Sequence, residues 1–423
     1  MKKLLYVASS YGHILSFHIP YIKKLQEMNF EVHVAAAGAL GKIGANTTFS
    51  DALRDIPKID IPFQKKIFSP KNLGCTLELV QLIKKERYDV ISVHTSLAAF
   101  FVRLAVMLIR GSKPTVINTV HGYLFDKDTP FLKRNIFICA ERVTMLATDV
   151  LVVMNQQDYE IAEKYHLYRK RLIKIPGVGI DTQRFSREKV EEELLRDEMN
   201  NGNRNGTEES DRDSLRRTER LKFGIVENDI VLIYAAEFSK RKNQRMLIEA
   251  MSDLPPNVKL LLAGEGEQLE ECRKLTEHFG LNLTEHLKSK GEQMGSKSSN
   301  HGNRVLFLGH VKNLESYYYL SDICVSASRS EGLPFNIMEA MSMGLPIVAT
   351  NVKGHQDLVE EGVNGYLYDY DGIEGYVEVI KWLIKEHGSL RNNTDISKNN
   401  VIKAREYSLD NVINEVLNVY SEV

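Results

Sequence analysis

The chain is poor in the residues that mark secreted and membrane-spanning proteins. Its 423 residues include only four cysteines, which are scattered and form no C-x-x-C pair: Cys75, Cys139, Cys272 and Cys324. This usage favours reduced thiols in a cytoplasmic protein over a disulfide framework. No apolar run reaches the roughly 18 residues that a membrane span needs. The apolar stretch after Lys2 and Lys3 is short, lacks a signal-peptide cleavage site and is predicted to be a first β-strand.

The net charge of -1 hides an asymmetry between the two halves of the chain. Residues 1–186 hold 26 Lys/Arg and 16 Asp/Glu, whereas the remaining residues hold 29 and 40. A basic first half would favour an anionic membrane surface or a phosphorylated acceptor, and simple drift of surface charge is the alternative. We therefore expect peripheral docking at the inner face of the plasma membrane, and no nucleic-acid partner.

Short apolar runs alternate with segments of helical period along most of the chain, as expected for a parallel sheet covered on both faces. The strands predicted in the first half are 2–9, 30–36, 89–95, 115–122, 149–155 and 171–177. Those predicted in the second half are 229–237, 258–266, 304–311, 322–328, 345–350 and 365–370. The sequence thus predicts an α/β protein with two Rossmann-like, doubly wound domains that face each other across a cleft.

The break between the domains is predicted where Pro176, Gly177 and Gly179 interrupt the pattern. The expected parts are an N-terminal domain 1–180, a linker 181–222, a C-terminal domain 223–405, and a last helix 406–423 that packs back toward the N-terminal domain. Two segments, 187–220 and 284–303, are dense in charge, Asn and Gly. Such segments cannot bury apolar surface, so both are predicted to be mobile surface insertions.

Open parallel sheets bind ligands at the carboxyl ends of their strands, so residues just past the predicted strands are the site candidates. The first strand is followed by SSYGHIL, which is not the G-x-G-x-x-G fingerprint of dinucleotide enzymes. Gly12 can still allow close approach of a ligand, and a plain turn is the alternative. His121 and His94 end two successive strands, where a histidine can bond a sugar hydroxyl or a phosphate; a core histidine is the commoner reading.

Cations and glycines follow two strands of the second half. Lys240, Arg241 and Lys242 lie between a strand and a helix, which suits an anionic group such as diphosphate. A solvated basic turn is the alternative. Gly264 and Gly266, in the turn LAGEGE, would let backbone groups approach a flat ligand such as a base, although a G-x-G turn is a weak signal by itself.

The stretch SASRSEGLPFNIMEAMSMG, residues 326–344, contains a predicted helix start. Pro334 suits the first helical position, and Gly344 suits the end of the helix. The N–H groups of the first turn, near Phe335 and Asn336, would point outward with the positive end of the helix dipole behind them. This helix start therefore predicts an anion site.

Two carboxylates flank that anion site, Glu331 in the turn and Glu339 inside the helix. Carboxylates are poor ligands for an anion but good acceptors for the hydroxyls of a sugar and a ribose. The alternative is that Glu331 only favours the helix dipole and that Glu339 is solvated.

Metal binding is not predicted. D-x-D triplets, a possible cation motif, occur at 126–128, 211–213 and 369–371. All three lie in segments with turn chemistry or in an insertion. We accordingly expect no metal and no cofactor.

Together these motifs resemble glycosyltransferase family 4, whose members have the GT-B fold. The matching pieces are FHIPYIKKL, VHGY, PGVGIDTQRF, EFSKRKNQ, LAGEGE, LGHV, SEGLPFNIMEAMSMGLPIVATNVKGHQDLV and GYLYDYDG. They cover nearly the whole chain outside the two insertions, and E-G-L-P-F-N-I-M-E resembles the E-x7-E motif of the family. The pieces FHIPY and KGHQDLV are most similar to the branch that builds bacterial capsular polysaccharides and exopolysaccharides.

The resemblance implies a role for each candidate residue. Glu331 would contact the donor sugar, Lys242 would bind its diphosphate, and His121 would lie near the reacting centre. The residues that would complete the donor site are Gly12, Arg241, Gly264, Glu265, Val311, Phe335, Asn336 and Glu339, the last on the ribose hydroxyls. One departure is Glu237, which stands where many members carry an arginine five positions before the lysine. Arg241 is available to supply that charge, or the site is weaker.

The implied reaction moves a sugar from a nucleotide-diphosphate donor to a saccharide or a polyprenyl-diphosphate-linked acceptor, with retention and without metal. Two alternatives stay open. A nucleotide-sugar 2-epimerase shares this fold but lacks the E-x7-E arrangement. A non-catalytic, nucleotide-sugar-binding subunit of a polysaccharide assembly complex is compatible with the departure at Glu237.

Overall fold

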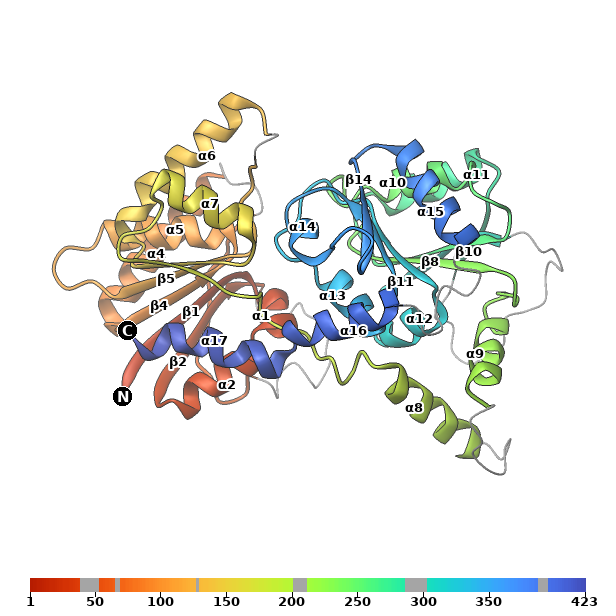
Figure 1. The fold of residues 1–423 in the computed structure, drawn as a ribbon. Coiled ribbons are helices and arrows are strands. Elements are labelled where there is room, and N and C mark those ends of the chain that lie inside the picture. Colours follow the sequence, from red (N-terminus) through yellow and green to blue (C-terminus); the bar gives the residue numbers. More distant parts are fainter. Residues whose placement is uncertain (39–52, 65–68, 127–128, 201–210, 286–302, 387–394) are drawn as a thin grey trace. The chain divides into compact units, whose positions relative to one another are not determined.

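The computed structural model describes residues 1–38, 53–64, 69–126, 129–200, 211–285, 303–386 and 395–423 (Figure 1). The chain folds into two units. Unit 1 consists of Met1–Gly179 and Leu409–Val423, and unit 2 of Ile180–Ser408. Among the described residues, no helix is both long and apolar enough to cross a membrane.

Unit 1 contains a seven-stranded parallel sheet in the order β3-β2-β1-β4-β5-β6-β7. Its strands are β1 (Lys2–Ser10), β2 (Phe30–Ala37), β3 (Lys58–Asp60), β4 (Val90–His94), β5 (Thr115–Val120), β6 (Val150–Val153) and β7 (Arg171–Lys174). Its helices are α1 (Tyr11–Phe17), α2 (Ile19–Glu27), α4 (Pro70–Glu86), α5 (Ser96–Met107), α6 (Phe131–Thr144), η1 (Met145–Ala147), α7 (Gln156–Tyr165) and α17 (Leu409–Ser421).

Unit 2 repeats this plan with a second seven-stranded parallel sheet, in the order β10-β11-β9-β8-β12-β13-β14. Its strands are β8 (Ile230–Ala235), β9 (Val258–Ala263), β10 (Asn282–Glu285), β11 (Asn303–Gly309), β12 (Ile323–Ser326), β13 (Ile347–Thr350) and β14 (Gly365–Tyr368). Its helices are α8 (Arg187–Asn200), α9 (Asp211–Leu221), α10 (Gln244–Ala250), α11 (Leu269–His278), α12 (Leu314–Leu320), α13 (Phe335–Ser342), α14 (His355–Leu358), α15 (Ile373–Glu386) and α16 (Asp395–Glu406).

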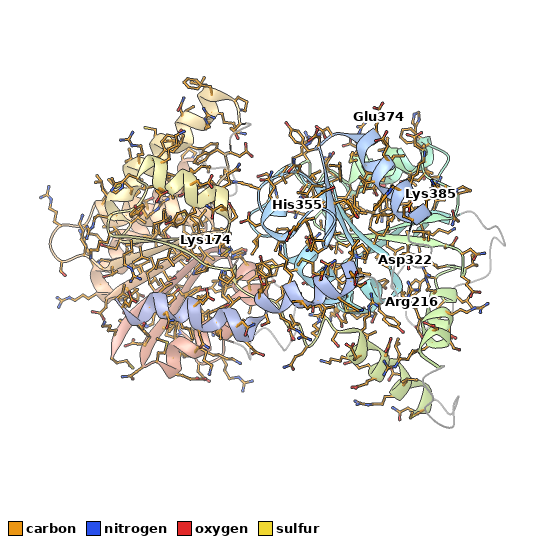
Figure 2. All side chains as sticks on the ribbon, in the orientation of Figure 1. Lys174, Arg216, Asp322, His355, Glu374 and Lys385 are labelled. Carbon is orange, nitrogen blue, oxygen red and sulfur yellow. The ribbon has the colours of Figure 1, made fainter. Side chains whose placement is uncertain are left out.

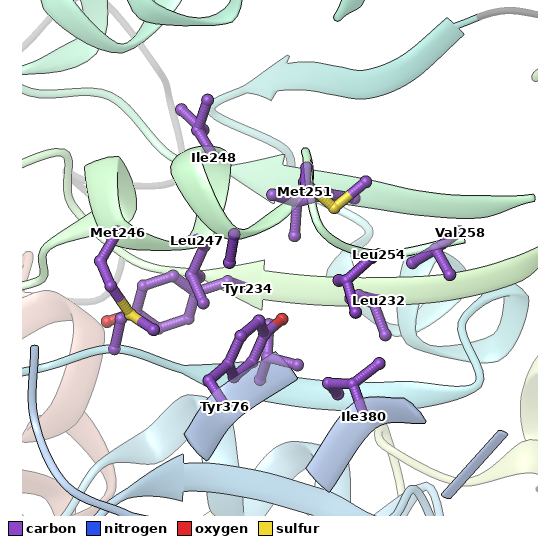
Figure 3. Close-up of a cluster of buried hydrophobic side chains, with 14 of the residues drawn as sticks. Leu232, Tyr234, Met246, Leu247, Ile248, Met251, Leu254, Val258, Tyr376 and Ile380 are labelled. Atoms are coloured by element: carbon purple, nitrogen blue, oxygen red, sulfur yellow. The ribbon is translucent and has the colours of Figure 1, made fainter. Parts of the chain in front are cut away.

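The central strands read as continuous apolar runs because helices cover both faces of each sheet. In unit 2, every residue of β9 is buried, including Lys259. One core of this unit joins side chains of β8, β9, α10 and α15 (Figure 3). In unit 1 a core lies among β1, β4, α4 and α5. These cores fix the strand ends from which the candidate site residues project.

The predicted strands are confirmed apart from small shifts at their ends, and two strands were missed. The missed strands are β3, with three residues, and β10, with four, and both lie at sheet edges. Neither carries the apolar run that identifies a central strand. Because β10 extends to Glu285, the predicted insertion at 284–303 starts too early, and its residues 286–302 lie outside the described part of the chain.

The prediction that residues 187–220 cannot bury apolar surface is wrong for the residues that the structure describes. They form α8 and α9, and Val190 and Leu215 are buried. Arg216 and Arg220 of α9 each place a guanidinium nitrogen 2.7 Å from the carboxylate of Asp322; Arg216 and Asp322 are labelled in Figure 2. The charges of this segment therefore hold α9 against the rest of unit 2.

The last helix, α17, belongs to unit 1 although it is distant in sequence. The hydroxyl of Tyr420 lies 2.6 Å from the hydroxyl of Ser92 on β4. At the start of α17, the backbone of Leu409 packs on Gly179, where an added Cβ would come within 2.7 Å of the Leu409 Cα. The described part of unit 1 is thus built from both ends of the chain.

Candidate active site

Each sheet has a topological switch point. This is the place where two neighbouring strands are followed by connections that run in opposite directions along the sheet. In unit 1 this point falls between β1 and β4, and in unit 2 between β8 and β12. Doubly wound sheets bind ligands beside the carboxyl ends of such strand pairs. The predicted site residues are therefore judged by their distance from these two points.

In unit 2, the loops that follow β8 and β12 lie side by side. The backbone N–H of Arg329 donates to the carbonyl of Arg241 at 2.9 Å, and the Tyr234 hydroxyl lies 2.7 Å from the Ser328 hydroxyl. Tyr234 also donates to the carbonyl of Lys242. These bonds bring the basic turn after β8 to the glutamate turn after β12.

Glu331 forms the centre of this loop pair. Its carboxylate accepts from the ammonium of Lys242 at 2.5 Å and from the guanidinium of Arg241 at 3.1 Å. Burial raises the pKa of Glu331, but the two cations outweigh it and bring the pKa down to about 2. The carboxylate is therefore ionised at neutral pH, and the predicted sugar-binding and diphosphate-binding residues are in direct contact.

The helix that follows, α13, starts at the predicted place but one residue later than expected. Pro334 is the N-cap rather than the first helical residue, and Phe335 begins the helix. Asn336 is buried, and its side-chain Nδ2 has no hydrogen-bond partner in the described part of the chain. A buried donor without a partner is costly, which makes it a natural contact for a ligand oxygen.

Glu339 lies on α13 and is half-buried. The Tyr318 hydroxyl donates to its carboxylate at 3.3 Å and to the backbone carbonyl of Asn336 at 3.0 Å. Burial raises the pKa of Glu339 to about 7, against the lowering effects of Tyr318 and Arg184. The two carboxylates of the E-x7-E motif therefore have different charges at neutral pH, Glu331 ionised and Glu339 partly protonated.

The sequence analysis missed a residue behind Glu331. His355 lies at the start of α14 (Figure 2). It is fully buried, with its Nδ1 2.8 Å from the carbonyl of Thr350 and its Nε2 3.3 Å from the hydroxyl of Ser326. Burial lowers the pKa of His355 to about 4, although Glu331 opposes this. The preceding Gly354 packs on the glutamate turn, since a Cβ there would lie 2.5 Å from the carbonyl of Gly332. In the sequence, the feature that could have identified His355 is the glycine–histidine pair in the segment KGHQ.

Gly264 and Gly266 have a clear packing role beside the site. Both have positive φ, and a Cβ would lie 2.0 Å from the carbonyl oxygen of Ala236 at Gly264 and 2.3 Å from that of Phe238 at Gly266. The Phe238 N–H donates to the carbonyl of Glu265 at 2.9 Å. Because neither glycine has a side chain, the turn after β9 can pack directly on the turn after β8.

The remaining candidates of unit 2 lie around this core. Val311 follows β11 and is half-buried, and the side chain of Glu265 is exposed. Glu237 is exposed too, and its carbonyl accepts from Gln244 at 2.9 Å. Asp371, from one D-x-D triplet, pairs with Arg329 at 2.9 Å and accepts from Asn243 at 3.0 Å.

In unit 1, the structure places Gly12 in α1 rather than in a turn before the helix. Its φ is not positive, and the nearest atom to an added Cβ would be the Ser10 hydroxyl at 3.9 Å. The space beside Gly12 is therefore open on the carboxyl side of β1. His121 follows β5 and lies 3.3 Å, nitrogen to nitrogen, from His94 at the end of β4. Burial lowers the pKa of His121 to about 3.

Comparison with known proteins identifies the class of protein to which these sites belong. A model described as "Glycosyl transferases group 1" matches residues 229–386, and one described as "Glycosyltransferase Family 4" matches residues 21–184. A Bacillus subtilis (strain 168) protein with the name "Putative glycosyltransferase EpsD" is 30% identical over 370 residues, which are 86% of this chain and 83% of that protein. The chain belongs to glycosyltransferase family 4.

Two further proteins are similar to this glycosyltransferase. An Escherichia coli protein named UDP-Gal:alpha-D-GlcNAc-diphosphoundecaprenol alpha-1,3-galactosyltransferase is 24% identical over 315 residues, 73% of this chain and 70% of that protein. The crystal structure of Anabaena Alr3699/HepE in complex with UDP-glucose matches with a TM-score of 0.69 and 20% identity, and the match covers 100% of both chains. The predicted family and the GT-B fold are confirmed.

Proposed function

We propose that this glycosyltransferase moves a sugar from a nucleotide-diphosphate donor to a lipid-linked saccharide acceptor, with retention and without a metal at the diphosphate. The contact that carries the proposal is the cluster of Lys242, Arg241 and Glu331 beside the start of α13. It combines two cations for a diphosphate with one ionised carboxylate for sugar hydroxyls.

The donor is proposed to lie along this cluster. The diphosphate takes Lys242 and Arg241, while the first turn of α13 adds backbone N–H groups and the positive end of the helix dipole. Glu331 then accepts hydroxyls of the sugar, and Glu339 accepts hydroxyls of the ribose. The length of the E-x7-E motif corresponds to the span of the donor from its sugar through diphosphate to ribose.

The chemistry follows from the charge that develops as the bond to diphosphate breaks. Negative charge grows on the leaving oxygens, where Lys242 and Arg241 stabilise it without a metal ion. Glu331 is held by both cations and is thereby a poor nucleophile toward the anomeric carbon. We therefore propose front-side attack by the acceptor hydroxyl, whose proton passes to the departing diphosphate, so that the configuration is retained.

The acceptor is proposed to bind unit 1 through its lipid. A cavity of about 440 Å³ lies among α4, α5, α6 and the segment after β5. Its apolar lining includes Leu73, Leu97, Phe100, Phe101, Ile136 and Phe137. Leu73 and Ile136 are more than half exposed, and Phe131 and Leu132 at the start of α6 are about three-quarters exposed. A lipid-linked acceptor carries a polyprenyl chain, and we propose that this apolar chain binds in the cavity.

The same face is proposed to dock on an anionic membrane. The exposed cations Lys71 of α4 and Lys133 and Arg142 of α6 belong to the helices that carry the exposed apolar side chains. A basic rim around an apolar face suits the headgroups and the chains of an anionic bilayer. Flotation with anionic vesicles that is lost at high salt would support this docking, and no binding at low salt would contradict it.

A two-stage experiment tests the proposal. Nucleotide sugars are first screened for thermal stabilisation of the full chain, because a ligand that binds only the folded state raises the melting temperature. The stabilising donor is then incubated with a membrane extract. Transfer to a lipid-linked acceptor is expected. Epimerisation of UDP-N-acetylglucosamine without any acceptor, or donor binding with no transfer, would contradict the proposal.

The lipid cavity has its own test. Leu73→Asp places a charge at its exposed rim, and we expect a raised KM for the lipid-linked acceptor with unchanged donor binding. Ile402→Asp is the matched control, because Ile402 is a similarly exposed apolar residue on α16 of unit 2. Equal effects of the two substitutions would contradict a role of the cavity.

A further inference from the structure

Four histidines gather at the switch point of unit 1, the position that corresponds to the Glu331 cluster in unit 2. His13 lies in α1 and His18 directly follows it, so both come after β1. His94 ends β4, and His121 follows β5. Because β1, β4 and β5 are neighbours in the sheet, their carboxyl ends bring the four rings together. The steps of the proposed transfer are assigned to none of these four histidines.

The spacing of the ring nitrogens is compatible with a metal ion. His13 Nε2 and His18 Nε2 are 3.1 Å apart. His13, His18 and His121 each offer one ring nitrogen, and these three nitrogens all lie within 4.8 Å of one another. A tetrahedral zinc ion with Zn–N bonds of about 2.0 to 2.1 Å holds its nitrogen ligands about 3.4 Å apart. To reach that spacing, the two nitrogens that are farthest apart would have to approach each other by no more than about 1.4 Å.

Neighbouring groups orient these rings. The Tyr6 hydroxyl lies 2.8 Å from Nδ1 of His18, the nitrogen away from His13. His94 Nδ1 lies 3.3 Å from His121 Nε2, and His94 Nε2 is 3.0 Å from the Ser92 hydroxyl. Partners on the second ring nitrogen are the usual way in which proteins fix the tautomer and orientation of a metal-binding histidine.

The cluster is accessible to solvent on one side. His13 and His121 are half-buried while His18 is fully buried, so solvent reaches the cluster from the side of the first two.

We propose that His13, His18 and His121 bind one divalent transition-metal ion, with zinc as the representative, and that His94 positions His121. Three imidazoles favour zinc over Mg²⁺ or Ca²⁺, which prefer oxygen ligands. Three protein ligands leave a fourth position for water or for an oxygen of a ligand. The site differs in residues and in ligand type from the diphosphate cluster of unit 2.

The test measures metal content and needs no activity. The tag-free full chain is dialysed against Zn²⁺, desalted and analysed for metal, and in parallel titrated with Zn²⁺ by calorimetry. We expect one zinc ion per chain, a raised melting temperature, and no binding of Mg²⁺. A Co²⁺-loaded sample should show the intense visible absorption of a four-coordinate ion.

Variants assign the ligands. His13→Ala and His121→Ala should each lose the stoichiometric zinc, and His94→Ala should weaken binding about 10- to 100-fold. His166→Asn is the control, because His166 is an exposed histidine of the same unit whose positive φ suits asparagine. Circular dichroism checks that each variant is folded. No retained zinc in the parent chain, or equal zinc in the parent and the His13→Ala/His121→Ala double variant, would overturn the proposal.

Discussion

The ammonium of Lys242 lies 2.5 Å from the carboxylate of Glu331, and the guanidinium of Arg241 is 3.1 Å from the other oxygen of the same carboxylate. Three charged residues that are proposed to bind different parts of one donor thus bind each other. Donor binding would exchange these contacts for contacts with the donor. Its diphosphate would take over the two cations, and its sugar hydroxyls would take over the carboxylate.

Removal of the carboxylate should separate catalysis from folding. We expect Glu331→Ala to lower transfer by at least about 100-fold, because Glu331 is proposed to bind the sugar and to position Lys242. Glu331→Gln keeps the shape of the side chain but removes its charge, and should lose nearly as much activity. Circular dichroism and a transfer assay measure the two effects. Near-normal transfer by either variant would refute the assignment, and Glu267→Gln, an exposed carboxylate after β9, is the control.

Loss of one cation should weaken donor binding. We expect Arg241→Ala to raise the Kd for a nucleoside diphosphate sugar about 10-fold, since a charge-assisted contact to phosphate contributes about 1.5 to 3 kcal/mol. Isothermal titration with and without Mg²⁺ checks this, and we expect Mg²⁺ to leave the parent Kd unchanged. Lys274→Ala, which removes an exposed lysine from α11, is the control. Strict dependence on Mg²⁺ would show that the two cations are not sufficient.

The raised pKa of Glu339 should make donor binding depend on pH. The carboxylate form, which accepts ribose hydroxyls, predominates above pH 7, and the protonated form predominates below it, because the pKa is about 7. We expect nucleotide affinity to fall by up to about 10-fold in all as the pH drops from about 8 to 6, because the ionised fraction falls from about 0.9 to about 0.1. Glu339→Gln should flatten this dependence. An unchanged pH profile in that variant would remove Glu339 from the ribose site.

Stability should change with pH in the opposite sense. The pKa of Glu339 in the folded chain lies above its usual value of 4.5, so folding favours the protonated acid. Its favourable contribution is complete below about pH 4.5 and is lost as the pH rises through 7. The unfolding free energy of Glu339→Gln, compared with that of the parent chain, should therefore rise by about 2 to 3 kcal/mol from pH 5 to pH 8. Urea unfolding at the two pH values measures the gain, and a loss at pH 8 would contradict the burial argument.

Two glycines at strand ends should respond differently to the same substitution. Gly264→Ala should destabilise unit 2 by at least about 3 kcal/mol, because its φ is +140° and the new Cβ would overlap the carbonyl of Ala236. Gly12→Ala should keep the full stability of unit 1, because the space beside it is open. Thermal unfolding of both variants measures the difference, and equal losses of stability would contradict the packing argument.

The pair of arginines on α9 gives a further prediction. Asp322→Ala leaves Arg216 and Arg220 without the carboxylate that they share, and Arg220 is buried. We expect a loss of about 3 to 5 kcal/mol in unfolding free energy, typical when one partner of a buried ion pair is removed. Limited proteolysis should then cut within α9. Arg217→Ala, which removes an arginine that pairs with Glu227 at the surface, should have little effect.

The sequence was a good guide to the central strands and a poorer guide to the elements around them. A strand such as β9 is covered on both faces, so its apolar run is visible without any tertiary information. The edge strand β3 has only three residues, Lys58–Asp60, and its place depends on pairing with β2. Likewise α9 looked like a solvated insertion, because the acceptor of its arginines, Asp322, lies about a hundred residues further along the chain.

The candidate site, too, could be predicted only in part from the sequence. The strand-end rule led to Lys242, Glu331 and His121 because parallel strands bring their carboxyl ends to one edge. It could not reveal that Lys242 and Glu331 bond each other, since that contact depends on β8 and β12 being neighbours in the sheet. It also passed over His355, whose role depends on its contacts with Thr350 and Ser326.

The assignment of Leu409–Val423 to unit 1 has a consequence for how the chain is made. As the protein leaves the ribosome, residues 1–179 emerge first, but the helix that supplies Tyr420 to Ser92 emerges after all of unit 2. The nascent first unit therefore stays incompletely covered until Leu409–Val423 has been made. A translation product that stops before Leu409 would lack this helix, and Ser92 would lose its Tyr420 partner.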